Sequence, residues 1–94
     1  MPLFTLTCLD RPGSLQVRMS AREAHLAYVA RMAPTVRLGG PFLGPGGEMC
    51  GSLLIVETAD LASAQAFSAA DPYVLAGLFE RVEIRPFRVT VGAL

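Results

Sequence analysis

The stretch MCGSLLIVETA at residues 49–59 most constrains the fold of this chain, because its middle is apolar without interruption. A short run of this kind, rich in Leu, Ile and Val, is typical of a strand that lies inside a sheet with neighbours on both sides. The loop sequence GPGGE at residues 44–48 separates it from the segment before. We therefore expect a sheet with residues 49–59 in its interior, to which the rest of the chain supplies partner strands and a cover.

The other segments predict three more strands and two helices. Ser20 and Glu23 have the spacing of a capping box, so the first helix is expected to begin after Ser20 and to be stopped by Pro34. Asp60 is expected to cap the second helix. Pro86 indicates that the last strand lies at a sheet edge or stops pairing there. The expected strands are 3–9, 35–43, 49–59 and 79–89, and the expected helices are 21–32 and 61–70.

The order strand, helix, strand, strand, helix, strand is that of an α+β, ferredoxin-like βαββαβ fold. An antiparallel sheet of this kind carries its helices on one face and leaves the other face bare. The chain has 94 residues, which suits a single domain spanning 1–94, and 52% of its residues are hydrophobic. Because so short a chain buries only about 60–65% of its unfolded surface, we expect the bare face to pack against a second copy. The predicted assembly is a homodimer or a higher oligomer.

Charge and cysteine content argue against several classes of partner. Eight arginines, with no lysine, balance eight aspartates and glutamates, so there is no basic excess for nucleic acid. No apolar run approaches the roughly eighteen residues of a bilayer span, and the N-terminus lacks a leader-like pattern. We therefore expect a cytoplasmic protein that binds neither nucleic acid nor membrane. Cys8 and Cys50 are isolated from each other and from the single histidine, which predicts free thiols and no metal site.

His25, the only histidine, falls in the predicted first helix beside its apolar stripe. That stripe is predicted at Leu26, Val29, Ala30 and Ala33, which have the spacing i, i+3, i+4 and i+7. Histidine can move protons near neutral pH. A histidine without a partner is more often a structural hydrogen-bonding residue than a catalyst. A catalytic role for His25 therefore requires a neighbouring side chain that orients its imidazole.

Asp71 is the candidate partner of His25. In SAADPYVLAGLF, residues 68–79, the chain leaves a helix and places Asp71 directly before Pro72 and Tyr73. Both helices lie on one sheet face in the predicted fold, so a carboxylate that ends the second helix can meet His25 and orient its imidazole. The alternative is a turn-forming carboxylate before proline. Spacing alone leaves both interpretations open.

Longer stretches of the sequence resemble the YciI-like, or YCII-related, family. They are DRPGSLQVRMSAREAHLAYV (10–29), GGPF (39–42), GSLLIVE (51–57) and LASAQAFSAADPYVLAGLFERVEIRPF (61–87). The resemblance covers nearly the whole chain, and its most specific parts are the Arg-x-x-His of Arg22 and His25 and the Asp-Pro-Tyr that begins at Asp71. It implies a dimeric α+β barrel built from ferredoxin-like units, with His25 and Asp71 as an active-site dyad. One member of the family removes HCl from a chlorinated hydroxyquinone, which implies acid–base chemistry with no cofactor.

Residues near this pair are candidates for binding a substrate. Arg18 and Arg22 are interpreted first as surface charges near a helix start, and the alternative is that Arg22 or Arg11 holds an anionic substrate beside the pair. Tyr73 is expected to close the pocket with an aromatic wall and a hydroxyl group. Gly39 either relieves crowding in its strand or lets a ligand approach the backbone.

Two functions follow from these residues. The first is a small cofactor-free enzyme of the lyase or isomerase type, in which His25 is the general acid or base and Asp71 orients it. The second is a non-catalytic dimeric module that binds a metabolite or assists another protein. A hydrogen bond between His25 and Asp71 beside a cavity would favour the enzyme, and burial of both side chains without a cavity would favour a structural role.

Overall fold

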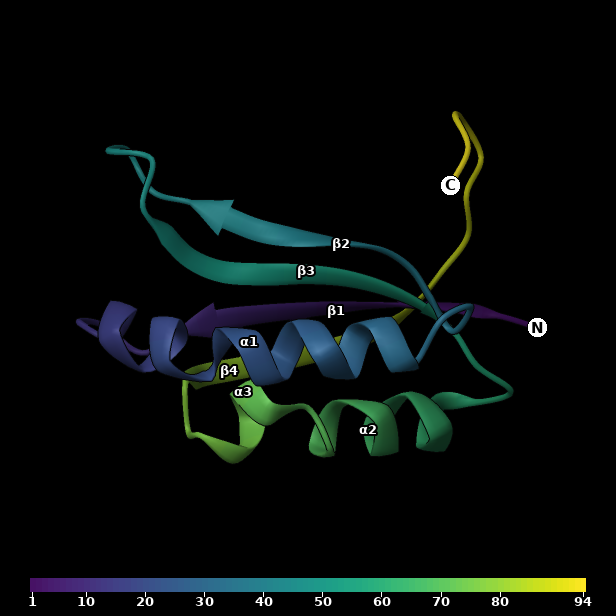
Figure 1. Ribbon diagram of the computed structural model, residues 1–94. Coiled ribbons are helices and arrows are strands. Elements are labelled where there is room, and N and C mark those ends of the chain that lie inside the picture. Colours follow the sequence, from purple (N-terminus) through teal and green to yellow (C-terminus); the bar gives the residue numbers. More distant parts are fainter.

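Four strands form one antiparallel sheet, and the helices cover one of its faces (Figure 1). The structure, a computed structural model, describes residues 1–94. Its elements are β1 Leu3–Asp10, α1 Leu15–Arg31, β2 Val36–Leu43, β3 Met49–Glu57, α2 Leu61–Ala69, α3 Pro72–Leu75 and β4 Phe79–Phe87. The strand order β2-β3-β1-β4 confirms the α+β ferredoxin-like fold, with β3 in the interior and β4 at an edge. The short helix α3, between α2 and β4, was not expected.

The hydrophobic core lies between the sheet and the helices. Alternate residues of β1, namely Phe4, Leu6 and Cys8, face the helices and are buried, as are Leu54 and Val56 of β3. Burying a side chain the size of leucine or phenylalanine stabilises the fold by about 1.5–3 kcal/mol. This core fixes the position of β1 and β3, which carry part of the candidate site.

Helices α1 and α2 lie side by side on this face (Figure 1). The hydroxyl of Tyr28 in α1 donates a hydrogen bond to the carbonyl oxygen of Phe67 in α2 at 2.7 Å, and the two rings are 5.2 Å apart. Asp60 caps α2 by accepting a hydrogen bond from the backbone N–H of Ser63, as predicted. No helix in the structure combines the length and the apolar composition that crossing a membrane requires.

The opposite face of the sheet has no cover within one chain. Because side chains alternate along a strand, the residues of β1 that do not face the helices point to this side. Leu9 of β1 and Leu38 of β2 are 42% and 43% exposed there. Along the edge strand β4 the same side carries Arg81, Glu83 and Arg85, which form ion pairs with one another. This face therefore exposes leucines of β1 and β2 and carries charged residues along β4.

The first helix differs from the prediction in its start and in the face that it buries. It begins at Leu15 and not after Ser20, because Gly13 turns the chain with a φ of +71° and Ser14 becomes the N-cap residue. Ser20 lies inside the helix, so the capping-box interpretation was wrong.

The predicted apolar stripe of α1 was wrong as well. Leu26 is 47% exposed, and Ala30 and Ala33 are exposed too. The buried residues of α1 are Arg18, His25 and Tyr28. All three carry a polar group, so a search for apolar periodicity cannot find the face that this helix turns inward.

Candidate active site

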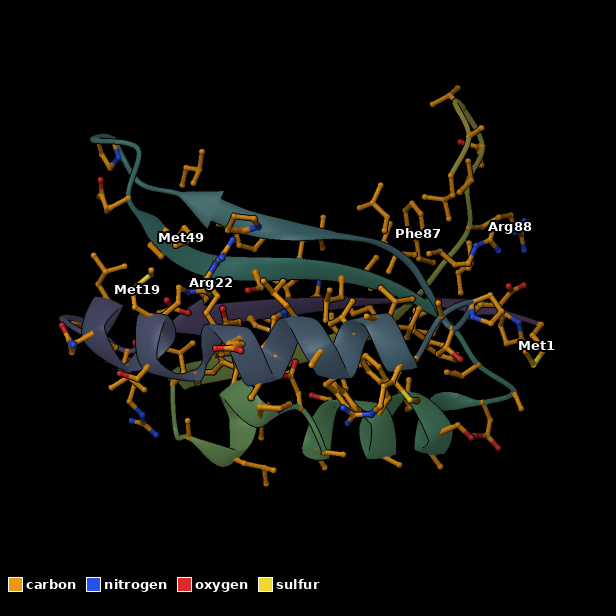
Figure 2. All side chains as sticks on the ribbon, viewed as in Figure 1. Met1, Met19, Arg22, Met49, Phe87 and Arg88 are labelled. Carbon is orange, nitrogen blue, oxygen red and sulfur yellow. The ribbon has the colours of Figure 1, made fainter.

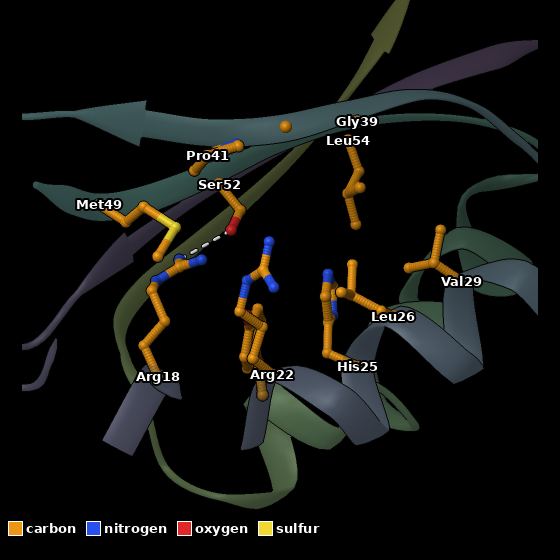
Figure 3. Close-up of a pocket in the computed structure, with 12 residues that line it drawn as sticks. Arg18, Arg22, His25, Leu26, Val29, Gly39, Pro41, Met49, Ser52 and Leu54 are labelled. Carbon is orange, nitrogen blue, oxygen red and sulfur yellow. Dashed lines mark hydrogen bonds between the residues drawn. The ribbon is translucent and has the colours of Figure 1, made fainter. Parts of the chain in front are cut away.

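A cavity of about 160 Å³ lies between α1 and the strands β2 and β3 (Figure 3). A dry cavity of roughly 150 Å³ in another protein holds one benzene molecule, so this volume suits a ligand with a single ring. The cavity is open to solvent on one side, which leaves room for substituents. Its lining residues are Arg18, Arg22, His25, Leu26, Val29, Gly39, Gly40, Pro41, Met49, Ser52, Leu54 and Tyr73.

His25 and Asp71 form a hydrogen-bonded pair at this cavity. The His25 Nδ1 atom lies 2.8 Å from Asp71 Oδ1, and the two residues are 7% and 3% exposed. Asp71 is also the N-cap of α3, where the same Oδ1 atom accepts a hydrogen bond from the backbone N–H of Tyr73 at 2.9 Å. A carboxylate can only accept, so Nδ1 is the donor in a contact with ionised Asp71, and a neutral imidazole protonated there has Nε2 as its acceptor.

Both interpretations of Asp71 therefore describe part of what it does. Helix α2 ends at Ala69 and not at Asp71, and the carboxylate caps the next helix instead. The cap holds Asp71 in one orientation, and that orientation presents its oxygen to His25. The hydrogen bond beside a cavity, which would favour an enzyme over a structural role, is present in the structure.

Tyr73 packs directly against the imidazole of His25. Their ring centroids are 3.9 Å apart and the ring planes differ by 13°, so the rings are stacked. Tyr73 is 2% exposed and lines the cavity, as expected for an aromatic wall. Burial raises the pKa of Tyr73, and the nearby positive charges of Arg18 and Arg22 only partly oppose this. The phenol therefore keeps its hydrogen near neutral pH and helps to fix the plane of the imidazole.

The other predicted binding residues fall into two groups. Arg22 lies about one turn before His25 on α1 and points across the cavity toward β3 (Figures 2 and 3), without an ion-pair partner in the chain. A Cβ atom on Gly39 would lie 2.5 Å from Leu54 Cδ2, so glycine here permits close packing at the cavity wall. Arg11, in contrast, does not line the cavity. Its Nε atom donates to the carbonyl oxygen of Gly77 at 3.1 Å, so the structure removes Arg11 from the site.

Arg18 and Ser52 line the cavity and were not recognised from the sequence as parts of a site. Arg18 is only 2% exposed, which contradicts its interpretation as a surface charge. Its guanidinium donates to both carboxylate oxygens of Asp10, at 2.8 and 2.9 Å, and to the Ser52 hydroxyl at 2.8 Å. Burial alone would lower the pKa of Arg18, but the hydrogen bond to Asp10 and its negative charge outweigh this and raise the pKa.

One signal in the sequence could have indicated this arrangement. Arg18, Arg22 and His25 have the spacing i, i+4 and i+7, which places three basic side chains on one side of a helix that starts at Leu15. The i, i+4, i+7 spacing was not recognised, because the capping box at Ser20 placed the predicted start of the helix after Arg18.

The fold and this site together describe a small ferredoxin-like α+β protein with a buried His–Asp pair beside a cavity. The model of the YCII-related domain family matches residues 2–88, and the chain belongs to that family.

Individual relatives agree with this assignment. The protein YciI of Escherichia coli O6:H1 is 38% identical, in an alignment that covers 92% of this chain and 96% of that protein. Among solved structures, the fold is similar to that of 5-chloro-2-hydroxyhydroquinone dehydrochlorinase from Burkholderia phenoliruptrix AC1100, in complex with 2,5-dihydroxybenzoquinone. The TM-score is 0.87 at 38% identity, and the match covers 92% of this chain and 93% of that one. A NIPSNAP family protein from Agrobacterium tumefaciens is 21% identical, with a TM-score of 0.58 and coverage of 94% and 91%, and shares the fold.

Proposed function

We propose that this chain is a cofactor-free enzyme that carries out acid–base chemistry of the lyase or isomerase type on a small molecule with one ring. The observation that carries the proposal is the 2.8 Å hydrogen bond from His25 Nδ1 to Asp71 beside a cavity of about 160 Å³. A buried carboxylate that orients an imidazole is the arrangement that general acid–base catalysis needs.

His25 is the residue that exchanges a proton with the substrate in this proposal. Because Asp71 occupies Nδ1, the free Nε2 atom accepts a proton from a hydroxyl or an activated C–H group of the substrate and later returns one. Asp71 stays ionised and stabilises the imidazolium that forms. A positioned general base of this kind contributes about 10²- to 10⁴-fold to a rate.

Three further residues bind the substrate in this proposal. The guanidinium of Arg22 is free to pair with a negative charge on the substrate. Tyr73 supplies the wall that holds His25 in place. Gly39 lets Leu54 pack closely at the opposite wall and so leaves the cavity its space.

The related dehydrochlorinase supports a hydroxylated six-membered ring as the substrate class. That enzyme acts on a chlorinated hydroxyhydroquinone, and the compound bound in its structure is a dihydroxybenzoquinone. Loss of HCl needs an acceptor for the proton and an exit for chloride, and it needs no electron acceptor. A single base with an oxyanion partner is sufficient for such a step.

The proposal includes a cytoplasmic homodimer formed through the uncovered sheet face. Leu9 and Leu38 are each more than 40% exposed on that face, and 52% of the chain is hydrophobic. Exposed apolar surface of this kind is typical of a protein interface. The active cavity lies on the other side of the sheet, so each protomer would keep its own site.

The test is turnover of hydroxylated single-ring compounds by wild type, His25→Gln and Asp71→Asn. Chloride release from 5-chloro-2-hydroxyhydroquinone is the first assay, and a thermal-shift screen of hydroxyquinones and phenols widens it. Asparagine caps helices as well as aspartate does, so Asp71→Asn should keep α3 while it removes the charge. We expect each variant to lose about 10²-fold or more in kcat, and the double variant to lose little more than either single one.

Ser68→Ala is the control, because Ser68 is buried but does not line the cavity. Turnover that survives His25→Gln would refute the proposed chemistry. Ligands that bind to the wild type, with no turnover of any of them, would instead favour the non-catalytic binding module.

A further inference from the structure

Met49 lines the cavity although the alternation of side chains along β3 would turn it to the other face of the sheet. Leu54 and Val56 face the helices as part of the core, and Ser52 faces them through its hydrogen bond to α1. Counting back from Ser52 in steps of two reaches Cys50, so a regular strand would point Met49 to the uncovered face. Met49 points into the cavity instead (Figure 3).

A β-bulge in β3 causes this change of direction. The neighbouring residues Phe42 and Leu43 of β2 have partners in β3 that are two positions apart, Gly51 and Met49. Cys50 is therefore one extra residue in β3, and it is exposed. Bulges of this kind often lie next to active sites, where they re-aim a side chain. The bulge at Cys50 reverses the alternation and places Met49 on the cavity side.

Packing in the hydrophobic core does not account for the position of Met49. Met32, at the end of α1, packs against the core, but Met49 does not, and its side chain stays partly exposed. A methionine side chain is flexible and polarizable, so it adapts to irregular shapes and contacts aromatic rings favourably. Its place on the cavity wall therefore indicates contact with a ligand and not with the rest of the chain.

The α1 side of the cavity opening is also largely apolar. Met19, Arg22 and Leu26 have the spacing i, i+3 and i+7, which places them along one edge of α1. Met19 and Leu26 are 51% and 47% exposed, and of the three only Arg22 is charged. Figure 2 shows Met19 and Met49 toward the same end of the molecule. A group that leaves the cavity by this side therefore meets apolar side chains.

The volume of the cavity determines which part of a ligand reaches these side chains. A benzene-sized ring fills a cavity of about 160 Å³. A substituent on that ring must then extend through the open side, between Met49 and Leu26. Each methylene group that is removed from water there favours binding, whereas a polar atom against these side chains loses water and gains no partner. A short alkyl group meets both conditions.

We propose that Met49, turned inward by the β-bulge at Cys50, selects hydroxylated rings that carry a short alkyl group, because it contacts that group at the cavity opening. Met49 is a specificity-determining residue in this inference, and Leu26 is the side chain that faces it. The inference deepens the proposed function and rests on it: His25 acts on the ring, and Met49 decides which substituted rings are held.

The test compares two probes of equal size, 4-propylphenol and 4-(2-hydroxyethyl)phenol, which differ only in whether the chain ends in a methyl or a hydroxyl group. Binding is measured by isothermal titration calorimetry. We expect the wild type to bind 4-propylphenol about five- to twentyfold more tightly. Along the series phenol, 4-ethylphenol and 4-propylphenol, affinity should rise by about two- to fourfold for each carbon.

Two variants of Met49 separate its apolar character from its size. Met49→Gln keeps the length of the side chain but ends it in an amide, and it should reduce the preference for 4-propylphenol to less than about twofold. Met49→Leu stays apolar and should keep most of the preference. Leu61→Gln is the matched control, because Leu61 is 42% exposed on α2 and does not line the cavity. It should bind both probes as the wild type does.

The methyl groups of the four methionines report the contact directly. In protein labelled with ¹³C at the methionine ε-methyl groups, saturating 4-propylphenol should shift the NMR signal of Met49. The signals of Met1 and Met32, which do not line the cavity, should stay in place. An unshifted Met49 signal, or a preference that survives Met49→Gln, would overturn the inference. Absence of 4-propylphenol binding to the wild type would overturn it too.

His25→Gln distinguishes failure of this inference from failure of the proposed function. Binding of the probes needs no proton transfer, so His25→Gln should keep their affinity ratio within about twofold of the wild type. If His25→Gln keeps full turnover while Met49→Gln abolishes the preference, the acid–base role fails and the selectivity of Met49 stands. If His25→Gln loses turnover while Met49→Gln leaves the ratio unchanged, only the present inference fails.

Discussion

Arg18→Met should destabilise this protein far more than Arg37→Met, although both arginines form an ion pair at the same distance. Arg18 lies 2.8 Å from Asp10, and Arg37 lies 2.8 Å from Glu57. The pairs differ in burial. The side chains of Arg18 and Asp10 are 3% and 6% exposed, and those of Arg37 and Glu57 are 37% and 31% exposed. The second pair is therefore a matched control for the first.

The expected magnitudes follow from burial. Methionine fills much of the volume of the arginine stem, so the loss reports mainly the charge and its hydrogen bonds. Removing one partner of a buried pair leaves the other charge uncompensated and costs about 3–5 kcal/mol, whereas an exposed pair contributes about 0–1 kcal/mol. At about 4–8 °C per kcal/mol for a domain of this size, Arg18→Met should lower the Tm by roughly 12–40 °C.

The assay is urea unfolding at a fixed protomer concentration, because an oligomer makes apparent stability depend on concentration. Asp10→Ala and the double variant complete the cycle. The double variant should lose about 1–3 kcal/mol less than the sum of the single losses, since neither charge is then left alone. The reasoning is wrong if Arg18→Met and Arg37→Met lose the same free energy, or if the two single losses at the buried pair simply add.

Further measurements follow from other parts of the molecule. A thiol reagent at pH 8 should label Cys50 but not Cys8 in the folded protein, because burial, and then the Asp71 carboxylate, raise the pKa of Cys8 to about 12. Unfolding should release both thiols, and equal native labelling rates would contradict this. Gly39→Ala should destabilise the fold by about 1–3 kcal/mol through crowding against Leu54, while Gly40→Ala, where a Cβ meets nothing within 4 Å in one chain, should destabilise it less. Equal effects of the two variants would contradict it. Light scattering at micromolar concentration should show a homodimer, and a stable monomer would refute the proposed sheet-to-sheet assembly.

The order and type of the main elements could be predicted because each depends on local periodicity. The interior strand predicted at 49–59 is present as β3 at 49–57, Asp60 caps α2, and Pro86 lies in the edge strand β4. The start of α1 could not be predicted in the same way. Two serines, Ser14 and Ser20, each precede helix-forming residues, and the capping-box spacing favoured the wrong one. The turn at Gly13, with its positive φ, makes Ser14 the N-cap residue, and no pattern of hydrophobic residues indicates this backbone conformation.

The candidate site could be predicted only in part. The pairing of His25 with Asp71 was open on spacing alone and was favoured by the family resemblance, and the structure places the two side chains in contact. Ser52 was missed because it lies inside an apolar strand, where a single serine gives no signal. Its hydrogen-bond partner is an arginine 34 positions away on another element. Contacts of this kind arise from tertiary structure and leave no periodic trace in the sequence.

The inward face of α1 connects these observations. Residues 18, 22 and 25 project from one side of the helix within two turns and line the same cavity. A helix selected only for packing would carry apolar residues there, as α2 does with Ala64 and Phe67. Instead, α1 buries a guanidinium and an imidazole, and each requires a carboxylate from another element, Asp10 for the first and Asp71 for the second. Two separately compensated polar groups on one cavity wall are difficult to explain by stability, because apolar residues would fill the same space at less cost. They are explained if the cavity binds a polar ligand, since one helix then holds the imidazole and the guanidinium at a fixed separation on the same wall.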